Sequence, residues 1–367
     1  MTFGIIGGDR RYGELARLLE RDGHTVLTCR IGGEGIQGTV SEERDALEKT
    51  LSADTVILPL PLCREAGYLN CAGKPLAMQD VLDLLTPPAK KEPEEETPAK
   101  QGPGLSGNSE PCAEPENHAP ASRRLALAGM VPAGVQQEAE RRGIRLVDYF
   151  QLETLAVANA AATADAALCL TVQHTGQTLL GKRCLVLGFG RIGKLLCLRL
   201  RGLGASVTAA ARKGADRAWI RAMGFEALDL HALPGRLALP GRVTGRGAQT
   251  EPLDDFDVVY NTVPAPVLDQ ASLERLAGGV SRAAVPEEGE TDISRNASAP
   301  VLVELASRPG FDADAARRLG LRVLPAPGLP GRLVPSTAAG ALRDAVYELL
   351  TEESAARGTG AVYTSGI

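Results

Sequence analysis

The sequence predicts an α/β protein with two domains, each built on a parallel β-sheet with helices on both faces. The chain has 367 residues, which exceeds the size at which a single hydrophobic core stops growing. Hydrophobic residues make up 44% of it, enough for two cores. Short apolar segments typical of strands alternate with helical patterns, and strands separated by helices imply parallel sheets. We place the first domain at residues 1–150, the second at 151–333, and a C-terminal helix and tail at 334–367.

The first domain begins with strand-like segments separated by helical ones. Three segments have the pattern of buried strands: FGIIGG, HTVLTCRI and ADTVILPLPL. The helical pattern RYGELARLLERDG ends on a glycine. LALAGMV, GVQQEAERRG and IRLVDYF then repeat the order strand, helix, strand. Between these two parts, at about residues 87–120, the chain is rich in Pro, Glu, Gly and Ser. Such a segment buries too little apolar surface to offset the entropy of ordering, so we predict a disordered surface insertion.

Residues 151–175 form an Ala-rich helical pattern that is long enough to join the two domains. Glu153 and Asp165 within it favour a buried helix of a soluble protein over a membrane span. We expect five later segments to be the strands of the second domain: RCLVLGFG, ASVTAAA, DVVYNTV, PVLVELA and LRVLPAP. The last helical pattern, STAAGALRDAVYELLTEE, can return to pack on the first domain.

Composition argues against several classes of function. The formal net charge is −5 and aromatic residues make up 4% of the chain, which disfavours nucleic acid as a partner. The seven cysteines form no CxxC pair and no metal-ligand spacing with the four histidines, so we expect free thiols and no metal site. The chain starts directly with a strand-like run and shows no signal peptide. We therefore expect a cytoplasmic protein.

The motif GFGRIG at residues 188–193 predicts a nucleotide site. It directly follows the apolar segment CLVL and opens a helical run, which is the context that a GxGxxG motif requires. Gly188 would permit a tight turn, Gly190 would let the backbone approach a pyrophosphate, and Gly193 would allow close packing of helix on strand. Phe189, Arg191 and Ile192 complete the turn, and the free N–H groups of the helix N-terminus would face the phosphates.

The segment after the second strand of this domain predicts which dinucleotide binds. An Asp or Glu there would accept hydrogen bonds from the ribose 2′-hydroxyl, but the strand runs on as TAAARKG. Arg212 can form charge-assisted hydrogen bonds to a 2′-phosphate, and Lys213 adds a second positive charge. We therefore predict NADP, with NAD possible. The alternative is that both residues are solvated cations at a strand end.

A second set of cofactor contacts is expected after a later strand. Ligands of open α/β sheets lie outside the carboxyl ends of the strands. This rule places residues 261–264 (Asn261, Thr262, Val263 and Pro264) near the nicotinamide half of the cofactor. Glu304, on the next strand, reads equally well as structural or as facing the cleft. Together the motifs predict a pair of Rossmann-like domains joined by a long helix, with the cofactor in a cleft between them.

These segments resemble the A subunit of dipicolinate synthase from spore-forming bacteria. The resemblance rests on IIGGDRR, the long helix after DYFQLE, GKRCLVLGFGRIG, NTVPAPVLD, LVELASRPG and GLPGRLVPSTAA, in this order. It covers nearly the whole chain except the insertion and the loops at 233–252 and 281–299. It implies oxidation of a dihydrodipicolinate-type ring to pyridine-2,6-dicarboxylate with NAD(P)+ in the mother cell of a sporulating bacterium. It also implies that the partner is a flavoprotein-like B subunit.

A dicarboxylate substrate requires cations, and arginine suits a carboxylate because its planar fork can form two parallel hydrogen bonds. Our candidates are Arg10 and Arg11 after the first strand, and Arg308 and Arg332 near strand ends of the second domain. Two other functions stay open. One is a different two-domain NAD(P)-dependent dehydrogenase, although the sequence shows no His–carboxylate pair typical of such enzymes. The other is a non-catalytic nucleotide-binding subunit of a flavoprotein complex. For the dipicolinate synthase subunit we expect an oligomer.

Overall fold

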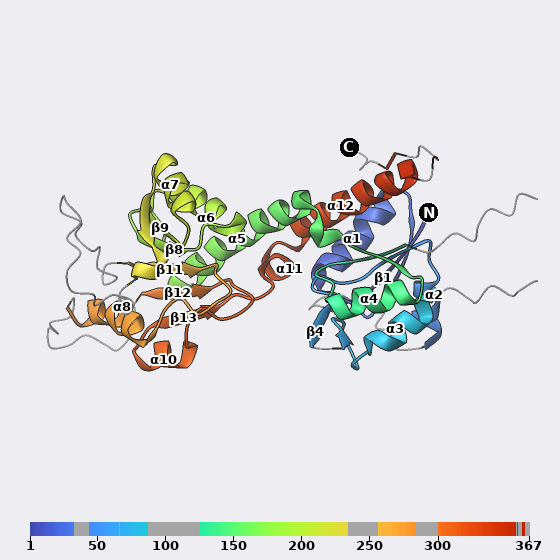
Figure 1. The fold of residues 1–367 in the computed structure, drawn as a ribbon, viewed down its shortest axis with the longest axis horizontal. Coiled ribbons are helices and arrows are strands. Elements are labelled where there is room, and N and C mark those ends of the chain that lie inside the picture. Colours follow the sequence, from blue (N-terminus) through green and yellow to red (C-terminus); the bar gives the residue numbers. More distant parts are fainter. Residues whose placement is uncertain are drawn as a thin grey trace, which may run out of the picture. The chain divides into compact units, whose positions relative to one another are not determined.

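The computed structural model describes residues 1–32, 44–65, 67–86, 125–233, 256–282, 300–356, 358 and 362–363. The chain divides into two compact units, one of Met1–Gln151 with Val346–Ile367 and one of Leu152–Ala345. Each unit is an α/β domain with its own parallel sheet, as predicted (Figure 1). The insertion at 87–120 and almost all of the loops at 233–252 and 281–299 lie outside the described residues.

The sheet of the first domain has five parallel strands in the order β2-β1-β3-β6-β7. These are β1 (Thr2–Ile6), β2 (Thr25–Cys29), β3 (Thr55–Ile57), β6 (Leu125–Ala128) and β7 (Arg145–Asp148). The helices are α1 (Arg10–Arg21), α2 (Arg44–Leu51), α3 (Met78–Leu85) and α4 (Ala133–Arg141). A short antiparallel hairpin of β4 (Cys63–Glu65) and β5 (Tyr68–Leu69) follows β3. Because β2 lies on one side of β1 and β3 on the other, the strand order reverses between β1 and β3.

Apolar spacing along α1 explains how this helix covers the sheet. Tyr12, Leu15 and Leu19 follow the helical repeat and are fully buried. Asp9 caps the helix, because its side chain accepts a hydrogen bond from the N–H of Arg11. Tyr12 continues inward to Tyr149, whose hydroxyl lies 2.7 Å from that of Tyr12.

Part of the C-terminal helix belongs to the first domain. The helix α12 spans Pro335–Ala356, and its residues from Val346 onward group with the first unit. The Tyr347 hydroxyl donates a hydrogen bond to Asp22 at 2.8 Å and lies 3.1 Å from the His24 ring nitrogen Nε2. Arg145 forms an ion pair with Glu353 in the same region. The last turns of α12 are thus part of the first domain's structure.

The sheet of the second domain has six parallel strands in the order β10-β9-β8-β11-β12-β13. These are β8 (Arg183–Leu187), β9 (Ser206–Ala211), β10 (Glu226–Asp229), β11 (Val258–Asn261), β12 (Val301–Glu304) and β13 (Arg322–Pro325). Numbered along the chain, the order is 3-2-1-4-5-6, which is that of dinucleotide-binding domains. The sequence pattern predicted all of these strands except β10.

The helices of the second domain include one that is long and apolar. They are α5 (Glu153–Thr175), α6 (Arg191–Gly202), α7 (Gly214–Ala222), α8 (Gln270–Arg282), α10 (Ala313–Arg318) and α11 (Leu329–Leu333), with a 3₁₀ turn at Leu230–Ala232. By length and composition alone α5 is apolar enough to cross a membrane, but 56% of its most apolar 18-residue stretch is buried within the structure. Ala164, Ala166 and Ala167 of this helix belong to the same core cluster as Leu196 and Leu200 of α6. This burial explains its apolar character.

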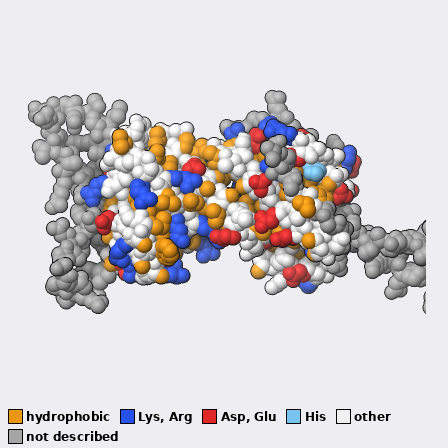
Figure 2. Space-filling model, turned by 90° about the horizontal axis from the view of Figure 1, so that it is seen from above, with side chains coloured by type: hydrophobic (Ala, Val, Ile, Leu, Met, Phe, Trp, Pro, Cys, Tyr) orange, Lys and Arg blue, Asp and Glu red, His pale blue; other side chains and the backbone are white. Residues whose placement is uncertain are grey.

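The surface of each domain is mixed in character. On the face shown in Figure 2, charged side chains of both domains lie among hydrophobic and uncharged ones.

Candidate functional site

The turn between β8 and α6 requires glycine at two of its three motif positions. Gly188 has φ of +98°, and a Cβ there would lie 2.4 Å from Oγ1 of Thr262. A Cβ on Gly193 would lie 2.2 Å from the carbonyl oxygen of Gly188. The first glycine therefore permits the bend, and the third lets α6 pack directly against the end of β8.

The middle glycine, Gly190, faces open space. It is the N-cap residue of α6, and a Cβ built on it would meet no atom within 4 Å. It has no side chain to accept a hydrogen bond from the first turn of the helix. The helix therefore presents N–H groups and the positive end of its dipole beside unfilled space, which is the arrangement that binds a pyrophosphate.

Thr262 and Asn261 support this turn from the neighbouring strand. Both the N–H and the hydroxyl of Thr262 donate to the carbonyl oxygen of Leu187, at 2.9 and 2.8 Å. Asn261 is fully buried, and its Nδ2 donates to Glu304 Oε1 at 2.8 Å and to the Val263 carbonyl at 3.1 Å. Its Oδ1 accepts the Val263 N–H at 3.1 Å. The Asn261 side chain thus shapes the loop after β11.

Glu304 does the same for the loop after β12. Its two carboxylate oxygens accept the N–H groups of Ala306 at 3.0 Å and Gly310 at 2.8 Å. Gly310 is held so close that a Cβ on it would lie 2.2 Å from Nδ2 of Asn261. Of the two interpretations that the sequence left open for Glu304, these contacts favour the structural one.

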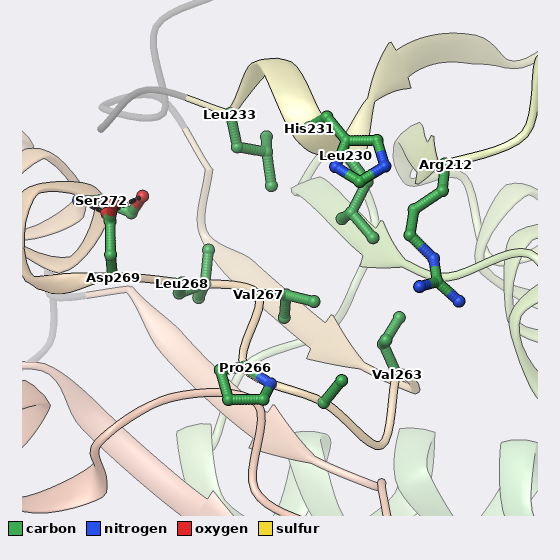
Figure 3. A pocket seen from close by; sticks show the side chains of 11 residues that line it. Arg212, Leu230, His231, Leu233, Val263, Pro266, Val267, Leu268, Asp269 and Ser272 are labelled. Atoms are coloured by element: carbon green, nitrogen blue, oxygen red, sulfur yellow. Dashed lines mark hydrogen bonds between the residues drawn. The ribbon is translucent and has the colours of Figure 1, made fainter. Parts of the chain in front are cut away.

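A cavity of about 170 Å³ lies where the loops after β9, β10 and β11 converge. Arg212 and Leu230 border it on one side, and Pro266, Val267 and Leu268 border it on the other (Figure 3). The other lining residues are His231, Leu233, Val263, Ala265, Asp269 and Ser272. The cavity is mostly apolar with one guanidinium at its margin. This combination suits a flat heterocycle attached to an anionic group.

Arg212 follows β9 directly and is exposed, as is Lys213. Arg217, on the next helix, donates to the carbonyl oxygens of Arg212 at 2.7 Å and Ala211 at 3.1 Å. Arg217 also forms an ion pair with Asp229 at 3.2 Å. Arg217 therefore holds the backbone of Arg212 in place and is itself held by Asp229 of β10. The Arg212 side chain points along the cavity (Figure 3).

The other predicted cofactor residues divide into core and surface. Phe189 is 6% exposed and packs in the domain core, and Ile192 packs against the same cluster. Arg191 is exposed, and its Nε lies 3.0 Å from both carboxylate oxygens of Glu153 at the start of α5. Pro264 lies in the loop after β11, between Val263 and Ala265, which line the cavity.

The predicted substrate residues lie on both domains. Arg308 is exposed in the loop after β12, and Arg332 is exposed on α11. The Arg332 guanidinium forms a long hydrogen bond of 3.4 Å to the Pro327 carbonyl. Arg10 is exposed at the start of α1 in the first domain. The cleft between the domains stays a prediction.

The far wall of the cavity was not predicted from the sequence. Leu230, His231 and Leu233 were not assigned because β10 was not recognised. The segment FEALDL carries Glu226 and Asp229 among apolar residues and so lacks the continuous apolar run of the other strands. Likewise, Pro266 to Leu268 lie just beyond the predicted residues 261–264 and were not included.

Comparison with known proteins supports the resemblance found in the sequence. Residues 2–89 match the family model for the N-terminal domain of the dipicolinate synthase A subunit. The A subunit of dipicolinate synthase from Bacillus subtilis (strain 168) is 29% identical over 233 residues, which are 63% of this chain and 66% of that protein. The chain is related to the A subunit of dipicolinate synthase. The match spans just under two thirds of that relative's length.

Solved structures of the dipicolinate synthase A subunit share the fold across nearly the whole chain. The A chain from Bacillus subtilis superposes with a TM-score of 0.63 at 23% identity, covering 97% of both chains. Its counterpart from Bacillus halodurans gives a TM-score of 0.61 at 23% identity, covering 95% of this chain and 97% of that one. The resemblance stated from the sequence is confirmed, and so is the fold class of two parallel-sheet α/β domains.

Proposed function

We propose that this chain is the NAD(P)-dependent oxidoreductase subunit of a dipicolinate synthase. It would oxidise a dihydrodipicolinate-type ring to pyridine-2,6-dicarboxylate. The relationship to the dipicolinate synthase A subunit supports the substrate class. The observation that carries the redox assignment is the glycine turn, in which Gly190 leaves the N-terminus of α6 beside open space.

The coenzyme would lie along the carboxyl edge of the second sheet. Its pyrophosphate would face Gly188, Gly190 and the first turn of α6, and its adenosine would occupy the cavity beside Arg212. Arg212 and Lys213 would bind a 2′-phosphate, which favours NADP over NAD. Apolar lining from Leu230 and Val267 would cover the adenine.

The nicotinamide half would lie near residues 261–264, at the point where the strand order reverses between β8 and β11. A bound NADP+ would accept a hydride from the substrate ring, and a proton leaves the ring as it becomes aromatic. Because aromatisation is favourable, the chain needs to orient the ring more than to supply a strong base. Arg308, Arg332 and Arg10 are candidates to bind a substrate carboxylate.

The same proposal includes a partner, an oligomeric assembly, and action in the cytoplasm of the mother cell during sporulation. The partner would be a flavoprotein-like B subunit. The relationship to one subunit of a synthase supports this partner.

A turnover assay tests the function. The purified chain, with and without a B-type subunit, is mixed with NADP+ and the condensation product of aspartate semialdehyde and pyruvate. Reduced nicotinamide and the pyridine product are then followed by absorbance. We expect both signals to rise together in the chain, and Gly190→Ala to need at least about tenfold more NADP+ for the same rate. Turnover by the pair alone would favour a nucleotide-binding subunit, and no turnover in either mixture would contradict the substrate assignment.

A further inference from the structure

Two buried arginines lie at one edge of the first domain, and they differ in their partners. Arg11 is 5% exposed, and it forms two hydrogen bonds to Asp9, Nε to Oδ1 at 2.8 Å and Nη2 to Oδ2 at 2.9 Å. Arg30 is 9% exposed, and its Nη1 donates to the Lys74 carbonyl at 2.8 Å. Its Nε is buried without any hydrogen-bond partner, and no carboxylate in the described ranges forms an ion pair with it.

A buried guanidinium without an anion is costly, because the charge loses hydration and gains only one carbonyl in exchange. Arg11 shows how this fold meets that cost, with a bidentate carboxylate from its own helix cap. Arg30 also has φ of +55°, a left-handed conformation that is unfavourable for a residue with a side chain. Both features are typical of a residue kept for a ligand.

The segments around Arg30 converge at the carboxyl edge of the first sheet, next to the place where the strand order reverses. The Gly7 N–H donates to the Cys29 carbonyl at 2.9 Å, and the Ala72 N–H donates to the Arg30 carbonyl at 2.9 Å. The Gly8 N–H donates to the Asn70 carbonyl at 2.7 Å. The loops after β1, β2 and the hairpin thus meet at the carboxyl edge of the sheet, over β1 and β2. The strand order reverses on the other side of β1, between β1 and β3, and sheets with this order bind ligands at the carboxyl ends of their strands beside that point.

Asn70 contributes a second group without a partner at the same junction. It is 7% exposed, and its Nδ2 donates to the Pro61 carbonyl at 3.1 Å. Its Oδ1 is buried and accepts no hydrogen bond from the described part of the chain. The junction therefore holds one unused cationic donor on Arg30 and one unused acceptor on Asn70. A carboxylate next to an N–H or O–H group matches both.

We propose that Arg30 and Asn70 form a binding site for one carboxylate of the substrate and the ring N–H beside it. The proposal rests on the proposed function for the identity of the ligand. Arg30 binds the carboxylate, and Asn70 accepts a hydrogen bond from the ring nitrogen of the enamine (N–H) tautomer of the reduced ring. The site would therefore distinguish this N–H tautomer from the aromatic product, whose ring nitrogen carries no hydrogen.

Ligand binding to the full-length chain tests the Arg30 half. Binding of pyridine-2,6-dicarboxylate is measured by calorimetry for the parent, Arg30→Gln, Arg30→Lys and the exposed control Arg21→Gln. We expect Arg30→Gln to weaken binding about 10- to 100-fold, since one charge-assisted contact is lost. Arg30→Lys should recover part of the loss, and Arg21→Gln should bind as the parent does.

Two further measurements separate a ligand role from a structural one. If Arg30 binds a ligand, Arg30→Gln should melt at or above the temperature of the parent, because it removes an unpaired buried charge. Its NADPH affinity should stay within about twofold of the parent. If Arg30→Gln binds the dicarboxylate as tightly as the parent does, the proposal is overturned, whatever its melting temperature. The partner of the Arg30 Nε would then be a bound water.

Matched ligands test the Asn70 half. Piperidine-2,6-dicarboxylate carries the N–H, and benzene-1,3-dicarboxylate has the same two carboxylates without it. Asn70→Leu should weaken the binding of piperidine-2,6-dicarboxylate about tenfold more than that of benzene-1,3-dicarboxylate. Any general damage to the junction affects both ligands and cancels in this comparison. Equal losses for the two ligands would overturn the role of Asn70. A parent chain that binds NADPH but neither dicarboxylate would overturn the site and leave the coenzyme assignment intact.

Discussion

Gly193 packs so closely under Gly188 that a Cβ on Gly193 would lie 2.2 Å from the Gly188 carbonyl oxygen. The two ends of the glycine motif therefore fix each other, while Gly190 between them faces open space. This difference separates what the turn needs to fold from what it needs to bind a coenzyme. Substitutions at the two positions should have different effects.

Gly193→Ala should destabilise the second domain by about 1–3 kcal/mol, because α6 must move away from β8 to admit the methyl group. Urea unfolding followed by circular dichroism measures this loss. A variant as stable as the parent would show that the close approach of helix and strand is unnecessary.

Gly190→Ala should leave the free energy of unfolding close to that of the parent, because its Cβ meets no atom within 4 Å. Its NADPH affinity should fall at least about tenfold, since the methyl group would occupy the space needed by the pyrophosphate. Calorimetric titration beside the unfolding curve checks both. Normal affinity in a folded variant would place the phosphates elsewhere.

Arg212→Asp should shift the coenzyme preference from NADP towards NAD. The change removes the cation at the cavity margin and adds repulsion against a 2′-phosphate, which we expect to cost about tenfold or more in NADP affinity. Arg221→Asp, at the end of α7, is a control with the same charge change. Equal NADP affinities in the two variants would indicate that Arg212 is only a solvated cation.

Stability should fall as the pH rises from about 9 to 12, in part because of two buried thiols. Burial raises the pKa of Cys184 and Cys197 to about 12. The unfolded thiols lose their protons near pH 9 and the folded ones keep theirs, so the folded state binds more protons and unfolding is favoured as the pH rises. Each thiol contributes a slope of about 1.4 kcal/mol per pH unit. Cys197→Ala should flatten the curve, and Cys169→Ala, at an exposed position, should not.

Tyr149→Phe should destabilise the first domain more than Tyr12→Phe does. The Tyr149 hydroxyl donates to the Leu58 carbonyl at 2.8 Å, so the Tyr12 hydroxyl donates to Tyr149. Tyr149→Phe leaves two buried groups without partners, the Leu58 carbonyl and the Tyr12 hydroxyl, at about 1–3 kcal/mol each. Tyr12→Phe leaves only the Tyr149 hydroxyl without a donor, and that hydroxyl still donates to the Leu58 carbonyl. Denaturant unfolding of both variants measures the order, and a reversed order would contradict this hydrogen-bond direction.

The sequence predicted those parts of the fold that depend on local pattern. Continuous apolar segments marked β8 and β11, and the glycine spacing marked the turn into α6, because these signals lie within a few residues of one another. The edge strand β10 was missed since Glu226 and Asp229 flank only two apolar residues and leave no continuous apolar segment. The helices α2 and α3 of the first domain were missed as well.

The site was harder to predict where it depends on contacts between distant segments. Asn261 was expected to face the coenzyme, but its bond to Glu304 joins two strands that are 43 residues apart in sequence. The cavity wall from Leu230 to Leu233 meets Arg212 only through the packing of β10 beside β9. Arg30 carries no sequence signal, since its burial and the partner that it lacks are properties of the folded domain.

The most direct test of the coenzyme site uses Trp219, the single tryptophan of the chain, which lies on α7 shortly after Arg212. Titration with NADPH should quench its emission and raise that of the reduced nicotinamide by energy transfer, and half-saturation in Gly190→Ala should need at least about tenfold more NADPH than in the parent. An unquenched tryptophan at a large excess of NADPH, or the same titration curve in Gly190→Ala, would contradict the account.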